Sequence, residues 1–142
     1  MQKVLLTIKG TQTEHGESES IEFVTEGRLY HNDTGCSLEY DESELTGASG
    51  VTTRVILEDE SVTLSRSGAV DTHMVFEENQ VYESNFTTPA GTLRLSVLAL
   101  HVDSQLKDSG GSVDLEYELN MGNLSTVNRL NLSFRSVKDC VN

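Results

Sequence analysis

Apolar residues recur at every second position through most of this chain, which is the period of a β-strand with one buried face. The stretch VLLTI places Val4, Leu6 and Ile8 on one face, and SVTL does the same for Val62 and Leu64. Very few segments follow the helical period. The same step of two is found in these further sets: Ile21 and Phe23; Cys36, Leu38 and Tyr40; Val55 and Leu57; Met74 and Phe76; Leu93, Leu95 and Val97; Val113, Leu115, Tyr117 and Leu119; Leu130, Leu132 and Phe134.

Turn signals separate these runs, namely HNDTG, EDE, EENQ, TPAG and KDSGG. Strands that follow one another through short turns form an antiparallel meander. Because one amphipathic sheet cannot hide its apolar face, the meander must pack against a second sheet or close on itself, and closure also removes exposed edges. We therefore predict an all-β fold, a closed antiparallel meander β-barrel of about eight to ten strands.

The composition narrows the class of protein. The chain has 142 residues and no shift in composition that would mark a linker, so we expect a single β-barrel domain over residues 1–142. Its formal charge of −13 opposes nonspecific approach to nucleic acid. Apolar runs fall short of the ~20 residues that span a bilayer, and VLLTI is too short for a signal-peptide core. We expect a cytoplasmic protein that does not insert into membranes; its oligomeric state is left open.

Several blocks of the sequence resemble a known family. SLEYDESELTG, SVTLSRSGAV with MVF after it, FTTPAGTLRLSV, SVDLEYELNMGN and NRLNLSF occur in this order. They are similar to blocks of the YwiB-like bacterial proteins, an uncharacterised group with a lipocalin-like (calycin) β-barrel. The resemblance extends from Thr7 to Phe134. It implies a closed antiparallel barrel, in agreement with the alternation, but it implies no activity and no catalytic residue.

Candidate catalytic and metal-binding residues are sparse. No two of the histidines His15, His31, His73 and His101 have the spacing of metal ligands. His101 has the phase of Val97, which predicts a half-buried ring at a strand end. No GxSxG motif is present, and the acidic residues mostly fall in outward phases or turns. We therefore assign no catalytic residue, metal or cofactor, and an enzymatic activity has no support in the sequence.

An arginine stands where the alternation predicts a core residue. In SVTLSRSGAV, Arg66 has the phase of Val62 and Leu64, and Tyr40 and Tyr117 have the inward phase of their own strands. An arginine fork with tyrosine hydroxyls is a donor set that holds a carboxylate or phosphate at the end of an apolar cavity. Arg66 is therefore the candidate anchor of a ligand-binding site, with Tyr40 and Tyr117 beside it.

Two other interpretations of Arg66 stay open. It can end its strand before the Ser67–Gly68 break and extend to solvent, or it can complete a buried ion pair. Glu39 and Glu116 are poor partners for such a pair, because they have the opposite phase.

The sequence thus favours a non-enzymatic barrel that binds a small amphipathic or apolar molecule with an anionic end. One alternative is a solid-core barrel that acts through a protein-interaction surface, and another is an enzyme that acts on a small molecule at the barrel mouth. The volume of the interior separates the first two hypotheses. A core filled by four phenylalanines would leave no room for a ligand: Phe23, Phe76, Phe86 and Phe134.

Overall fold

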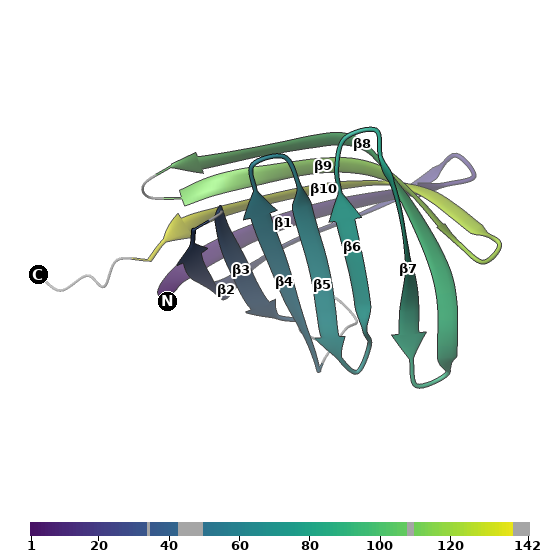
Figure 1. Cartoon of the computed structure of the whole chain (residues 1–142), viewed down its shortest axis with the longest axis horizontal. Helices are drawn as coiled ribbons and strands as arrows, with labels where there is room; N and C mark the ends of the chain where they lie inside the picture. The colour runs from purple at the N-terminus through teal and green to yellow at the C-terminus, as the bar shows by residue number, and fades with distance from the viewer. Residues whose placement is uncertain (34, 43–49, 108–109, 138–142) are drawn as a thin grey trace, which may run out of the picture.

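A computed structural model describes residues 1–33, 35–42, 50–107 and 110–137. These residues form ten β-strands and no helix, so no described helix could cross a membrane (Figure 1). The strands are β1 (Gln2–Glu14), β2 (Glu17–Asn32), β3 (Gly35–Asp41), β4 (Val51–Glu58), β5 (Val62–Gly68), β6 (Thr72–Phe76), β7 (Val81–Thr88), β8 (Gly91–Lys107), β9 (Gly110–Met121) and β10 (Leu124–Ser136).

All ten strands belong to one antiparallel sheet with the order β6-β5-β4-β3-β2-β1-β10-β9-β8-β7. The first and last strands pair with each other, so β1 and β10 lie in the middle of the sheet. The two edge strands meet near Asp71 and Thr87, which form an isolated antiparallel bridge. The sheet is therefore a nearly closed barrel, which confirms the predicted antiparallel barrel and its number of strands.

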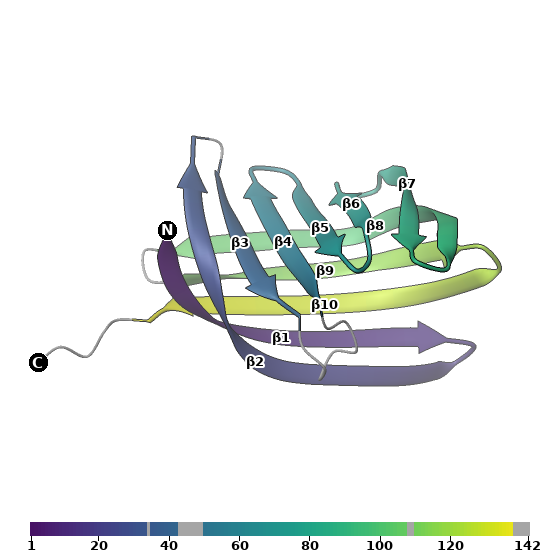
Figure 2. The ribbon, with the colours of Figure 1, turned by 90° about the horizontal axis from the view of Figure 1, so that it is seen from below.

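The strands differ greatly in length, and this shapes the barrel. The strands β1, β2, β8, β9 and β10 have 12 to 17 residues, whereas β3 to β7 have five to eight. In Figure 2 the long β1–β2 hairpin runs on beyond the short strand β3. The wall of long strands therefore continues past the ends of the short strands.

The interior is an apolar cluster built from the predicted inward positions. Side chains of Leu64, Phe76, Leu95, Leu115 and Leu132 are each at most 3% exposed, as the alternation predicts. Tyr117, also predicted to be buried, is only partly buried, because it packs against the core at its border. Other members of the cluster include Val4, Leu6, Ile8, Leu38, Val55, Leu57, Val62, Val97, Val113 and Phe134.

One strand departs from simple alternation. Ala99 lies opposite Tyr117, but His101 lies opposite Glu116, so Leu100 is the extra residue of a β-bulge. Beyond this bulge the phase of β8 is inverted, and Val102 packs against the core. His101 does not share the inward phase of Val97, and it lies within β8 rather than at its end, so these two parts of the prediction are wrong. Its side chain is half exposed (49%), as expected. It belongs to the outer face.

Candidate functional site

A cavity of about 510 Å³ lies between the long strands β1, β2, β9 and β10 and the ends of the short strands β3, β5 and β6. Its volume falls within the range of small-molecule sites. Apolar side chains from several strands line it: Ile8, Ile21, Phe23, Leu64, Met74, Leu119 and Leu130. Polar side chains also reach it, among them Gln12, Tyr40, Glu42, Arg66, Tyr117, Asn128 and Arg129.

The four phenylalanines divide between core and cavity. Phe76 and Phe134 are buried, at 0% and 5% exposure, and Phe86 is partly buried against the core. Phe23, on the long hairpin, instead lines the cavity. The aromatic residues therefore fill one part of the interior and leave the other part open, so the four rings do not make a solid core.

Arg66 lines this cavity from β5. It lies directly opposite Thr53 on β4 and Thr72 on β6, two strands whose inner faces are buried. Its Nε is fully buried and has no hydrogen-bond partner among the described residues. Nor does the guanidinium form an ion pair with any described carboxylate. The Nε–H group of Arg66 is thus removed from water and donates no hydrogen bond to the described residues.

The structure brings Tyr40 and Tyr117 to the same cavity as Arg66. Neighbouring rings fix them: the ring of Phe76 lies 4.7 Å from that of Tyr117, and the ring of Phe23 lies 6.5 Å from that of Tyr40. Burial raises the pKa of both tyrosine hydroxyls, and the positive charge of Arg66 acts against this increase. Both therefore stay protonated and can donate a hydrogen bond.

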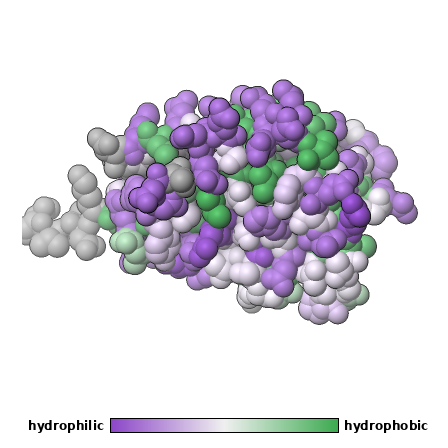
Figure 3. Space-filling model, in the orientation of Figure 1, coloured by the Kyte–Doolittle hydropathy of each residue, from purple (hydrophilic) through white to green (hydrophobic). Residues whose placement is uncertain are grey.

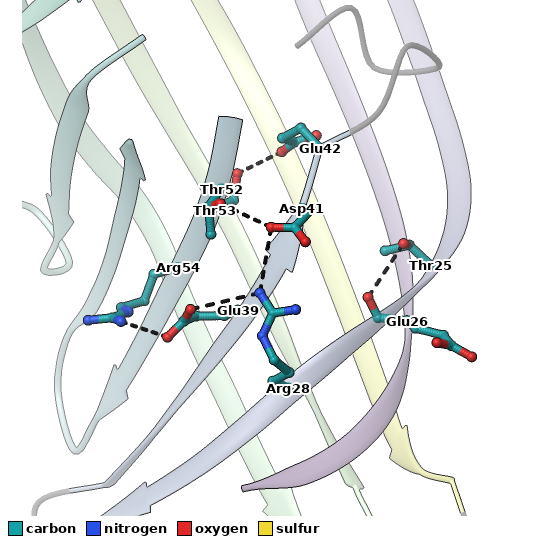
Figure 4. A network of polar contacts seen from close by, with 9 residues as sticks. All are labelled: Thr25, Glu26, Arg28, Glu39, Asp41, Glu42, Thr52, Thr53 and Arg54. Carbon is teal, nitrogen blue, oxygen red and sulfur yellow. Dashed lines mark hydrogen bonds and ion pairs between the residues drawn. The ribbon is translucent and has the colours of Figure 1, made fainter. Parts of the chain in front are cut away.

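Glu42 is a cavity-lining residue that the sequence analysis missed. It follows β3 directly, and its backbone N–H donates to the carbonyl oxygen of Val51 (2.8 Å), which extends the ladder by one residue. Its Oε1 accepts a hydrogen bond from the Thr53 hydroxyl at 2.7 Å (Figure 4). The carboxylate is also one of the causes that raise the pKa of Tyr40, after burial. A signal was present, since Glu42 stands two residues after Tyr40 and so has its phase.

Asn128 is another cavity-lining residue that the sequence analysis did not single out. It lies opposite Tyr117 on the neighbouring strand, and its amide nitrogen donates to the Thr126 hydroxyl at 2.8 Å. Its phase is that of the apolar residues Leu130 and Leu132. A polar residue in an otherwise apolar phase was the signal that identified Arg66, and the same signal applies here.

The outer face of β2, β3 and β4 carries a separate network of charges (Figure 4). Glu39 accepts a hydrogen bond from Arg54 at 2.6 Å and lies 3.8 Å from a guanidinium nitrogen of Arg28. Asp41 pairs with Arg28 at 3.6 Å and accepts a hydrogen bond from Thr52. Glu39 is therefore engaged outside the barrel, as its opposite phase predicts.

The described residues contain no group of three or more histidine, cysteine or acidic side chains that could hold a metal ion. Cys36 is a buried free thiol whose pKa is raised by burial. The cavity is thus lined by two arginines (Arg66 and Arg129), two carboxylates (Glu19 and Glu42), hydroxyls and amides beside its apolar side chains. Such groups can bind and orient a polar end.

Comparisons with known proteins agree with the fold. The family model described as "Domain of unknown function (DUF1934)" matches residues 6–132. The crystal structure of the ywiB protein from Bacillus subtilis is similar, with a TM-score of 0.87 and 23% sequence identity over 96% of this chain and 93% of that chain. No curated protein matches the chain at a significant level. These findings confirm the resemblance that the sequence blocks indicated.

Proposed function

Given that the chain belongs to the DUF1934 family, a domain of unknown function, we propose that its barrel binds a small molecule with an apolar body and an anionic end. One observation carries this proposal. Arg66 lines a cavity that has both apolar and polar side chains in its wall, and its guanidinium forms no hydrogen bond or ion pair with the described residues. A ligand carboxylate or phosphate is the chemical group that would pair with this cation.

The energetic argument rests on the cost of an unsatisfied cation. A buried donor without a partner loses about 1 to 3 kcal/mol, and a charged donor loses more. A carboxylate or phosphate oxygen would recover this energy through charge-assisted hydrogen bonds, which are about twice as strong as neutral ones. Tyr117, which borders the same cavity, supplies a neutral donor for a remaining oxygen lone pair, whereas the Tyr40 hydroxyl beside it already interacts with the Glu42 carboxylate.

The apolar part of the ligand has a matching surface. Ile8, Phe23 and Leu130 line the cavity on the long-strand side. Burial of a hydrocarbon chain against such side chains is favourable by about 25 cal/mol per Å² of apolar surface removed from water. A ligand with a short hydrocarbon body would therefore fill the chamber and direct its anionic end to Arg66.

The alternative of a protein-interaction surface has less support. Interaction sites are usually contiguous apolar patches of several hundred Å². On the face drawn in Figure 3, hydrophobic residues emerge as separate patches between hydrophilic ones. The exposed large apolar residues also belong to several strands, and include Ile21, Val24, Val81, Leu93, Leu106 and Val127. Ile21 among them borders the cavity itself.

Replacement of Arg66 by methionine tests the proposal. Arg66→Met should abolish binding of a fluorescent fatty-acid probe and leave stability to urea unchanged or slightly higher, because methionine has a similar volume and needs no counter-ion. Arg135→Met, at an exposed position outside the cavity, is the matched control and should bind the probe normally. Gly10→Leu places a side chain in the cavity and should block the probe without loss of the cation.

Two results would contradict the proposal. One is a wild-type protein that binds no such probe at any reachable concentration while Arg66→Met leaves stability unchanged. The other is equal binding by the wild type and Arg66→Met, because the arginine would then have no part in recognition.

A further inference from the structure

Three polar residues form one inward row on the short-strand wall of the barrel. Tyr40 lies directly opposite Thr53 in the β3–β4 pair, and Thr53 lies directly opposite Arg66 in the β4–β5 pair. Residues that face each other in this way have Cβ atoms about 4.5 to 5.5 Å apart. Tyr40 and Thr53 are 4% and 0% exposed, and Tyr40 and Arg66 both border the cavity. A phenol, a hydroxyl and a guanidinium are therefore held side by side.

The Glu42 carboxylate engages the first two members of this row. Its Oε1 accepts a hydrogen bond from the Thr53 hydroxyl at 2.7 Å (Figure 4). Burial raises the pKa of the Tyr40 hydroxyl most, and the charge of Glu42 and a hydrogen bond to its side chain raise that pKa further. Between a protonated phenol and a carboxylate, the phenol is the donor. The proton of Tyr40 is thus directed to Glu42.

Tyr117 is in the opposite situation. It belongs to β9, and its ring centroid lies 4.7 Å from that of Phe76 on β6, so its side chain reaches across the interior. Burial raises the pKa of its hydroxyl and the positive charge of Arg66 opposes this increase, whereas no described carboxylate contributes. The hydroxyl also forms no hydrogen bond within the described part of the chain. Of the two phenols that border the cavity, Tyr117 is the one with a free proton.

The other charged residues of the cavity wall do not cancel this asymmetry. Glu19 and Arg129 are both exposed to solvent and belong to the long strands β2 and β10. Arg129 alternates with the inward residue Leu130, so its side chain belongs to the outer face. Water and salt screen such exposed charges. Glu42 is instead part-buried and bound to the residue that faces Arg66, so it is the carboxylate that opposes an anion there.

Arg66 therefore has two unlike sides. Its Nε is buried, so the terminal N–H groups of the guanidinium are the donors that a ligand in the cavity can reach. Towards β3, a ligand anion would meet the charge of Glu42 and hydroxyls that already interact with it. Towards β9, it would meet the free hydroxyl of Tyr117. The repulsion on one side and the added hydrogen bond on the other favour the same position.

We propose that the anionic group of the ligand binds between Arg66 and Tyr117, on the β9 side of the guanidinium, and that Glu42 determines this position. This inference rests on the proposed function, because it assumes that the cavity binds an anionic ligand. It assigns Tyr117 as a ligand contact. Glu42 is a positioning residue, which acts by holding the Tyr40 hydroxyl and by repelling the anion from β3.

Matched tyrosine variants test the inference, with octanoate as the probe in calorimetric titration. Tyr117→Phe and Tyr40→Phe each remove one hydroxyl and keep the ring. Tyr117→Phe should weaken octanoate binding about tenfold, as expected for the loss of a hydrogen bond to a charged group. Tyr40→Phe should change it by about twofold or less, because its proton is already used within the protein. Thermal unfolding monitored by circular dichroism reports whether each variant is folded.

Further variants test the role of Glu42. Glu42→Gln should strengthen octanoate binding several-fold, because the repulsion near Arg66 is lost. Glu19→Gln removes an exposed carboxylate of the same cavity wall, and as the matched control it should change binding by about twofold or less. In a Glu42→Ala background the Tyr40 hydroxyl loses its carboxylate, so Tyr40→Phe should then weaken binding. A merely structural role of Glu42 would not produce this coupling.

A spectroscopic comparison keeps the test independent of the folding of Tyr117→Phe. The chain has four tyrosines, and labelling with 3-fluorotyrosine gives each a fluorine NMR signal. The Tyr117 signal can be assigned by elimination from Phe variants of the other three. On titration of the wild type with octanoate, it should shift more than the Tyr40 signal.

The outcomes separate this inference from the proposed function. If octanoate binding depends on Arg66 but Tyr40→Phe weakens it as much as Tyr117→Phe does, the inference is wrong and the proposed function stands. The same conclusion follows if the folded Glu42→Gln variant binds octanoate no more tightly than the wild type. If octanoate does not bind the folded wild type, both are wrong.

Discussion

Asp71 and Thr87 exchange both of their backbone hydrogen bonds, with an N···O distance of 2.9 Å in each direction. This isolated pair joins the two edges of a sheet whose other neighbouring strands are connected by ladders of five or more residue pairs. The closure between β6 and β7 therefore depends on far fewer backbone hydrogen bonds than any other junction in the described residues. We therefore expect the barrel to open at this junction with a smaller free energy than at its other junctions.

Hydrogen exchange should detect this weak junction. Amides that are protected by few neighbours open locally at a lower free energy than amides in the middle of a sheet. We expect the amide protons of Asp71 and Thr87 to exchange much faster than that of Ile8, which lies in β1 between two long partner strands. Equal protection of these three amides, measured by NMR, would show that the barrel is closed as firmly at β6 and β7 as elsewhere.

Truncation of core side chains should be costly. Leu95 and Leu115 are 3% and 1% exposed, and removal of a buried leucine side chain leaves a cavity as well as lost contacts. Leu95→Ala and Leu115→Ala should each lower the free energy of unfolding by about 2 to 5 kcal/mol in urea denaturation. Leu106→Ala, where the native side chain is 53% exposed, is the control and should have an effect within about half a kcal/mol. A loss below half a kcal/mol at both core positions would mean that the assigned faces are inverted.

The inward phase of most strands was readable from the sequence because alternation is a local property. The bulge at Leu100 was not, since in LALHV both phases are apolar and either register buries a hydrophobic residue. The sequence also did not indicate which strands form the two edges of the sheet. Strand pairing across the barrel depends on contacts between distant segments, and nothing in the residues around Asp71 marks an edge.

For the candidate site, the phase of Arg66, Tyr40 and Tyr117 was predicted from the residues. Their convergence was not readable, because they belong to three different strands and meet only when the barrel curves around them. Glu42 was overlooked because it stands in a polar stretch that resembles a loop. Its inward position follows from one added rung of the ladder beyond β3.

Stability should fall at alkaline pH because the folded protein shields the hydroxyls of Tyr40 and Tyr117 from water. Burial raises the pKa of Tyr40 and Tyr117 above the ordinary value of 10.0. Above about pH 10 the unfolded chain loses these protons and the folded chain keeps them, so the free energy of unfolding decreases as pH rises. Below that pH both states are protonated, and these groups cause no dependence on pH.

Each tyrosine should contribute a slope of up to about 1.4 kcal/mol per pH unit. Urea denaturation between about pH 9 and 11 measures the slope, and Tyr40→Phe should reduce it by the share of one group. A slope that is the same in the wild type and Tyr40→Phe would mean that this hydroxyl is not buried in the folded protein.

Salt should accelerate the binding of an anionic ligand. The protein carries a formal charge of −13, so a carboxylate probe is repelled as it approaches and attracted only once it is near Arg66. Because salt screens charges beyond a distance of about 10 Å at 0.1 M, it should reduce the long-range repulsion more than the local attraction. Stopped-flow measurements should give an association rate constant that increases with ionic strength. A decrease would place the entrance in a locally positive field.

The central claim is that the Arg66 guanidinium receives an anionic group in the cavity. NMR observation of the Nε–H proton of Arg66 tests it directly, with the signal assigned by its loss in Arg66→Lys. On titration with octanoate, this proton should shift in a saturable way, because the guanidinium that carries it gains a hydrogen bond to a carboxylate. A signal that stays unchanged up to the highest octanoate concentration that the folded protein tolerates would contradict the account.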